Sequence, residues 1–244
     1  MNKAIIIAFG MILGMTSCQK TCNPDAEQQS INDRLTGMTF SDCNIRFDGV
    51  TLTKSLNGGD SLVTVRDSVM TFDCSEGGDL FNDPNGKLSN HTVPAIFADV
   101  DNTKPFTISV KVKPEFTPDG TYNAADLLVM VNDSLYQKLC FEQDERGAHR
   151  VVSVRTVGTS DDNNHDVINQ DFVFLKISSD TRTIASYYSL DGHEWHMVRL
   201  YKNNYPEKIM IGLASQAPVK GSCQSVFTDL HLDQSNVADF RMGE

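Results

Sequence analysis

Short segments in which apolar and polar residues alternate recur along most of the chain. Between residues 106 and 113, Phe, Ile, Val and Val occupy the even positions, and Thr, Ser, Lys and Lys occupy the odd ones. Such alternation is typical of an antiparallel strand with one buried and one solvated face. Segments rich in β-branched or aromatic residues lie at 44–55, 61–74, 105–116, 125–131, 135–144, 150–157, 171–180, 183–190, 194–201, 208–216 and 225–232.

Turn-forming residues separate these segments, and helical periodicity is almost absent after residue 37. The separating sequences are rich in Gly, Asn, Asp and Ser, which favour turns. One of them is SDDNNHD at residues 160–166, which we expect to be a solvated loop. So many short strands predict an all-β fold, a two-sheet antiparallel jelly-roll sandwich. There are more of them than the strands of an immunoglobulin sandwich.

The N-terminus has the parts of a bacterial lipoprotein signal. Lys3 precedes an apolar run at residues 4–15, and MTSC at residues 15–18 resembles a lipobox. The run is too short to span a bilayer comfortably. We expect a signal peptide at residues 1–17, lipidation of Cys18 and, from Gln19 at the next position, an outer-membrane location in a bacterial cell envelope. The alternative is an ordinary signal peptide followed by a chance cysteine.

Residues 18–36 are polar and lack an apolar period, which predicts a flexible tether from lipidated Cys18. Residues 37–244 then form a single domain, since they contain no repeat and no internal linker. The formal net charge of −11 and the absence of a basic patch argue against a nucleic-acid partner. The membrane, reached through the lipid anchor, is an expected partner.

The cysteines and histidines give little support to a metal site or a cofactor. After Cys18 the spacing leaves the pairing of five cysteines open, namely Cys22, Cys43, Cys74, Cys140 and Cys223. None of them forms a CxxC motif. His193 and His196 lie in a turn and strand, where their spacing does not bring both rings to one side. We therefore expect no metal and no cofactor.

Residues 188–199, YSLDGHEWHMVR, predict a β-hairpin. Asp191-Gly192 is a strong turn signal, because glycine tolerates the positive φ of a tight turn. Trp195 either packs in the core or stacks on a sugar, and Arg199 follows it on the second strand. The sequence leaves open whether these two side chains face the core or a groove.

A second group of candidate residues lies in YQKLCFEQD, residues 136–144. Leu139 and Phe141 are expected on one face of the strand, and Lys138 and Glu142 on the other. Arg155 belongs to the next segment and pairs with Glu142 if the two strands are neighbours. This polar face either forms cross-strand pairs or binds a polysaccharide.

Glu142 and Asp144 begin the alternating carboxylate pattern of jelly-roll endoglucanases, but Arg146-Gly147 ends the strand before a third acid. No nucleophile motif is present either. We therefore assign no catalytic residues.

Several motifs in order resemble an uncharacterised family of concanavalin A-like domains, found in bacteria and fungi, whose yeast member is linked to regulation of enolase. They are DLFNDPNGK (79–87), KLCFEQD (138–144), VSVRTVGTSDD (152–162), YYSLDGHEWHMVR (187–199) and GLASQAPVKGSC (212–223). The resemblance covers residues 70–232 and implies a lectin/glucanase-type sandwich without an established activity. The motif positions are Asp79, Phe81, Lys138, Glu142, Thr156, Asp191, Trp195 and Arg199, of which Asp191 and Phe81 are expected to be structural.

These observations predict a cell-envelope lipoprotein whose domain binds a glycan without catalysis. The candidate ligand-binding residues are Lys138, Glu142, Arg155, Trp195 and Arg199. Two alternatives stay open: a glycan-active hydrolase that uses Glu142, and a structural envelope domain whose partner is another protein.

Overall fold

The computed structural model describes residues 38–244. The predicted signal peptide at 1–17, the lipidation of Cys18 and the tether at 18–36 lie outside these residues. Within the described part, no helix has the length and apolarity needed to cross a membrane.

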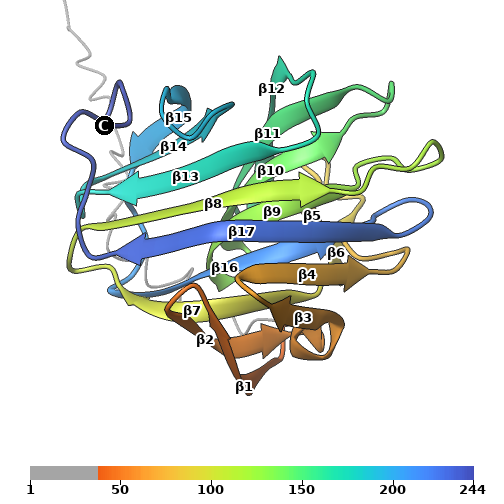
Figure 1. Cartoon of the computed structure of the whole chain (residues 1–244), viewed down its shortest axis with the longest axis horizontal. Helices are drawn as coiled ribbons and strands as arrows, with labels where there is room; N and C mark the ends of the chain where they lie inside the picture. The colour runs from red at the N-terminus through yellow and green to blue at the C-terminus, as the bar shows by residue number, and fades with distance from the viewer. Residues whose placement is uncertain (1–37) are drawn as a thin grey trace, which may run out of the picture. The chain divides into compact units, whose positions relative to one another are not determined.

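Two large antiparallel sheets make up most of the domain (Figure 1). The strands are β1 (Phe40–Phe47), β2 (Val50–Leu56), β3 (Val63–Arg66), β4 (Val69–Cys74), β5 (Leu80–Asn82), β6 (Ser89–His91), β7 (Ala95–Asp101), β8 (Phe106–Pro114), β9 (Ala124–Asn132), β10 (Leu135–Gln143), β11 (His149–Val157), β12 (Thr159–Val167), β13 (Val173–Ser179), β14 (Thr183–Ser189), β15 (His196–Lys202), β16 (Lys208–Gln216) and β17 (Cys223–Asp233), with a short 3₁₀ helix at Gly59–Leu62. The eight-stranded sheet has the order β1-β2-β7-β16-β9-β10-β11-β12, and the seven-stranded sheet has the order β15-β14-β13-β8-β17-β4-β3.

The hydrophobic core lies between the two sheets. In β8 the four apolar residues of the alternating segment, Phe106, Ile108, Val110 and Val112, are all buried in it. Leu139 and Phe141 of β10 reach the same core from the opposite sheet. The predicted all-β, two-sheet jelly-roll sandwich of the lectin/glucanase type is therefore confirmed.

The segment SDDNNHD does not form the expected loop. It lies within β12, which pairs with β11 at one edge of the eight-stranded sheet. Its polar composition follows from its position, because an edge strand leaves one row of backbone groups open and polar side chains protect it from further pairing. Composition alone predicted a turn, and the loop prediction is wrong.

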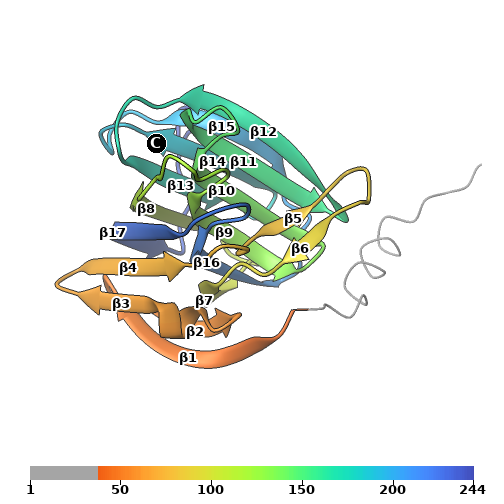
Figure 2. The same cartoon turned by 90° about the vertical axis from the view of Figure 1, so that its right-hand side faces the viewer.

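A small hairpin of β5 and β6 lies against the outer face of the eight-stranded sheet (Figure 2). Asn82 ties the hairpin to the sheet, because its backbone N–H donates to the Ser160 hydroxyl at 2.9 Å and its side-chain amide donates to the Asp133 carbonyl at 2.7 Å. At the other end of the hairpin, Gly78 forms a bridge with Ala217. One face of the sheet is therefore packed on the core, and the other is partly covered by this hairpin.

Candidate functional site

A cavity of about 430 Å³ lies between the β5–β6 hairpin and the outer face of the eight-stranded sheet. We call it the outer-face cavity. Its lining combines apolar, aromatic and carboxyl side chains, namely Asp79, Phe81, Leu88, Asn90, Tyr122, Glu142, Glu145, Val152, Val154, Asp162, Asn164, Pro218 and Val219. A concave, largely apolar hollow with a few polar groups is the usual form of a small-molecule site.

Strand alternation and register bring the floor of this cavity together. Glu142 of β10 lies on the outer face, as does Lys138 four residues earlier, while the residues between them at odd positions enter the core. Lys138 is directly opposite Val154 of β11, and Val154 is opposite Asp162 of β12. The expectation that Lys138 and Glu142 share one face of the strand, away from Leu139 and Phe141, is confirmed.

One glutamine amide links the two charged side chains of β10. Lys138 Nζ donates to Gln216 Oε1 at 2.8 Å, and Gln216 Nε2 donates to Glu142 Oε2 at 3.2 Å. The same Nε2 group donates to the backbone carbonyl of Tyr122, whose ring lines the cavity. Gln216 therefore fixes the position of Glu142 at the cavity wall and of Lys138 beneath it.

Burial sets the protonation behaviour of these groups. Loss of solvent raises the pKa of Glu142 well above its usual range, although Lys138 opposes the change. Burial alone disfavours the Lys138 ammonium, but nearby acidic groups, Cys140 and Asp126 first, outweigh it and raise its pKa. Asp126 is fully buried, and neither of its oxygens accepts a hydrogen bond from an N–H or hydroxyl donor among residues 38–244. Desolvation accordingly raises its pKa to about 6.

The buried Asp126 predicts a measurable pH dependence of stability. Its folded-state pKa is above that of an unfolded aspartate, so below that pKa the folded protein binds a proton that the unfolded chain does not. The free energy of unfolding should rise by about 1 kcal/mol as the solution is acidified from about pH 7.5 to about pH 5. Urea denaturation of wild type and Asp126→Asn at both pH values measures the contribution of Asp126. Equal changes in the two proteins would show that Asp126 does not contribute.

Arg155 is not part of the outer-face cavity. The register of β10 and β11 places Arg155 opposite Gln137 and places Arg150 opposite Glu142. Arg150 in turn pairs with Asp144 at 2.8 Å. The expected pairing of Arg155 with Glu142 is therefore wrong, because the register places the two side chains on opposite faces of the sheet.

The guanidinium groups of Arg155 and Arg199 lie on the side of the eight-stranded sheet that faces the other sheet. Arg155 stacks over the ring of Tyr201 of β15 at 4.7 Å from its centroid. Arg199 crosses from β15 to donate to the Ser153 hydroxyl at 3.1 Å and to the Asp161 carboxylate at 3.1 Å. These contacts join the edges of the two sheets.

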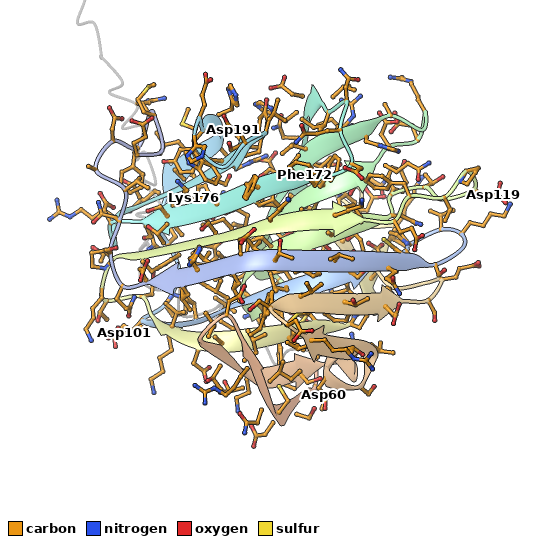
Figure 3. All side chains as sticks on the ribbon, viewed as in Figure 1. Asp60, Asp101, Asp119, Phe172, Lys176 and Asp191 are labelled. Atoms are coloured by element: carbon orange, nitrogen blue, oxygen red, sulfur yellow. The ribbon has the colours of Figure 1, made fainter. Side chains whose placement is uncertain are left out.

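Trp195 lies in a third place, on the outer face of the seven-stranded sheet, where it packs with Tyr187 of β14 and with the C-terminal residues Val237 and Phe240. Lys176 and Asp191, which lie in the same region, are labelled in Figure 3. The Lys176 ammonium lies 3.5 Å from the centroid of the indole ring and donates to the carbonyl of Gly243 at 2.9 Å. Asp191 accepts hydrogen bonds from the backbone N–H groups of the turn, as the predicted hairpin requires. The five candidate residues thus occupy three separate regions: of them only Glu142 lines the cavity, and Lys138 is linked to it through Gln216.

Trp195→Ala tests the role of the indole in holding the C-terminal segment. Loss of its half-buried packing and of the Lys176 contact should lower the free energy of unfolding by about 1–3 kcal/mol. It should also speed tryptic cleavage after Arg241, because the segment leaves the sheet more often. Trp195→Phe serves as the control and should keep most of both properties. Unchanged cleavage in Trp195→Ala would contradict this role.

The residues that sequence reasoning missed come mainly from distant parts of the chain. The alternation of residues 150–157 indicates that Val152 and Val154 share one face of a strand. That this face lies beside Glu142 depends on the pairing of β10 with β11. Nothing in the sequence marks Tyr122 or Gln216 as a site residue, because tyrosines in loops and glutamines at strand ends are common. Phe81, expected to be structural, lines the cavity and is only partly buried.

Two large antiparallel sheets with a cavity on one outer face define a lectin/glucanase-type β-sandwich. The family described as protein of unknown function DUF1349 matches residues 56–235, and the chain belongs to this family. No curated protein matches the chain.

Solved structures share the fold at low sequence identity. A functionally unknown protein from Saccharomyces cerevisiae is 17% identical with a TM-score of 0.66, and the match covers 82% of this chain and 97% of that one. The GH43 protein BlXynB from Bacillus licheniformis is 15% identical with a TM-score of 0.57, over 74% of this chain and 36% of that one. A xylan β-1,4-xylosidase from Bacillus halodurans is 15% identical with a TM-score of 0.53, over 69% of this chain and 34% of that one.

Proposed function

We propose that this protein binds carbohydrate without catalysis, and that its binding site is the outer-face cavity. The observation that carries the proposal is the combination of an apolar floor, two aromatic rings and several carboxyl groups in one hollow. Sugars present C–H faces that pack on rings such as those of Phe81 and Tyr122. Their hydroxyl groups donate hydrogen bonds to carboxylates and amides such as those of Asp162 and Asn164.

The charge of the cavity favours a neutral glycan. Its lining contains four carboxyl side chains, Asp79, Glu142, Glu145 and Asp162, and none of the lining residues is basic. An oligosaccharide that carries uronic acids would meet like charge in a partly desolvated space, which is costly. The neighbour described as a xylan β-1,4-xylosidase makes neutral xylo-oligosaccharides a sensible first probe.

We further propose that the domain is located at the cell envelope. A lipid on Cys18 would anchor it to a membrane, expected to be the outer membrane, and residues 18–36 would act as the tether. An anchored domain with a glycan site would hold polysaccharide near the cell surface or the cell wall.

A glycan array tests the binding proposal, with the full-length chain in detergent as the analyte. We expect binding to one or more neutral oligosaccharides, xylo-oligosaccharides among those printed, and none to uronic-acid oligosaccharides. Failure to bind any glycan at every concentration tested would overturn the proposal and favour a protein partner. Preference for uronic acids would contradict the charge argument.

A hydrolase is the second candidate function, because Glu142 has the property expected of a general acid. Its pKa is raised by burial, and Asp162 lines the same cavity. Chromatography of a bound oligosaccharide after incubation separates the two functions. If the protein only binds the oligosaccharide, no shorter products should form. If shorter products form and Glu142→Gln abolishes their formation but still binds the oligosaccharide, the protein is a hydrolase.

A further inference from the structure

Two of the described cysteines face each other across neighbouring strands. Cys74 is the last residue of β4, Cys223 is the first residue of β17, and the register pairs them directly. Both side chains are buried, and both pack with Ala217 in one cluster, so they lie on the same face of the sheet. The other described cysteines lack this arrangement: Cys140 is opposite Val152 and Asp126, and Cys43 donates to the Leu52 carbonyl.

The spacing of such a pair suits a disulfide bond. Directly opposed residues in an antiparallel ladder have Cα atoms about 4.5 or 5.5 Å apart, depending on the hydrogen-bonding class of the pair. Disulfides join residues whose Cα atoms are about 4.4–6.8 Å apart. Both cysteines are free thiols in the structure, and this Cα spacing allows their side chains to rotate toward each other to form the bond.

Both cysteines also line a cavity of about 230 Å³, together with Ser75, Glu115 and Thr117. A small oxidant can therefore approach the pair from this side. In the folded protein, burial raises the pKa of Cys74 to about 12 and raises that of Cys223 as well. Few thiolates are present at neutral pH, so oxidation should be faster during folding than afterwards.

We propose that Cys74 and Cys223 form a disulfide bond in the exported protein. The oxidant is a disulfide, either a low-molecular-weight one or that of an oxidase. The thiolate of one cysteine attacks it, forms a mixed disulfide and releases one thiol. The second thiolate then attacks the mixed disulfide, the protein S–S bond forms, and the second thiol leaves. The two cysteines lose two electrons and two protons, and the oxidant is reduced to two thiols.

The bond would brace the outer-face cavity. Four residues after Cys74, Gly78 bridges Ala217, with the Ala217 N–H donating to the Gly78 carbonyl at 3.0 Å. Asp79 follows on one side of this bridge and Pro218 on the other, and both line the cavity. The disulfide thus ties together the two chain segments that form these walls.

The test is a non-reducing peptide map of the full-length chain, exported by a bacterial host and alkylated before unfolding. We expect one disulfide-linked peptide pair that contains Cys74 and Cys223, and the same pair after refolding in a glutathione redox buffer. Cys43→Ser is the matched control and should leave the pair intact. Alkylation of both thiols in the exported and the refolded samples would overturn the proposal, as would linkage of either cysteine to another partner.

A second measurement does not depend on mapping. Because the bond closes a long loop, a reductant should lower the Tm of wild type by roughly 5–15 °C. The double variant Cys74→Ala/Cys223→Ala should show no response to the reductant. Equal melting of wild type with and without reductant would contradict a stabilising bond. Neither measurement requires a glycan, so failure here is distinct from failure of the binding proposal.

Discussion

Lys138→Met is expected to lower the free energy of unfolding by about 3–5 kcal/mol. Lys138 is 2% exposed, and its ammonium group is held by Gln216 near the buried carboxyl groups of Asp126 and Glu142. Methionine keeps most of the volume of the side chain but removes the buried positive charge that, within residues 38–244, favours ionisation of these two carboxyls. Urea denaturation at neutral pH measures the loss.

Lys113→Met is the matched control for this substitution. Lys113 pairs with Asp171 at the surface, where both side chains are more than half exposed. An exposed ion pair contributes about 0–1 kcal/mol, so this variant should stay close to wild type. Acidification should also reduce the loss of stability in Lys138→Met, because protonated carboxyl groups are neutral and are no longer stabilised by the ammonium group. Equal stability of the two variants at neutral pH would contradict the buried cluster.

Glu142→Ala is expected to weaken binding of the neutral oligosaccharide selected on the glycan array by about 10- to 100-fold. Glu142 lines the outer-face cavity, and its removal takes away a hydrogen-bonding group and leaves the Gln216 amide without one of its acceptors. Isothermal titration calorimetry of the two proteins with this oligosaccharide measures the change.

Two further variants show whether such a loss arises in the cavity. Glu194→Ala removes a carboxyl from the exposed β14–β15 turn and should bind like wild type. Val154→Trp removes no polar group but fills the floor of the cavity, and it should also bind weakly. Thermal melts of each variant establish that the domain is folded. Wild-type affinity in both Glu142→Ala and Val154→Trp would place the site elsewhere.

The faces of individual strands could be predicted from the sequence, because a strand exposes its side chains alternately. The outward position of Lys138 and Glu142 followed from this rule alone. Which residue of the next strand lies opposite depends on the connection between the strands. The observed register of β10 and β11 puts Arg150, and not Arg155, beside Glu142.

Packing between distant segments accounts for the remaining differences. Trp195 is covered by the C-terminal segment, and the sequence of the hairpin contains nothing that indicates this contact. Residues 160–166 have the composition of a loop, yet pairing with β11 makes them an edge strand. The cavity itself exists because the β5–β6 hairpin lies over β10 and β11, an arrangement set by tertiary contacts such as those of Asn82.

The central claim is that the protein binds a neutral glycan on the outer face of its eight-stranded sheet. The most direct test is an NMR titration of the isotopically labelled full-length chain with the array-selected neutral oligosaccharide. The account predicts that the amide signals that shift most belong to the cavity lining, with Phe81, Glu142 and Val154 among them. Shifts confined to the Trp195 region and the C-terminal segment, or no shifts at saturating oligosaccharide, would contradict it.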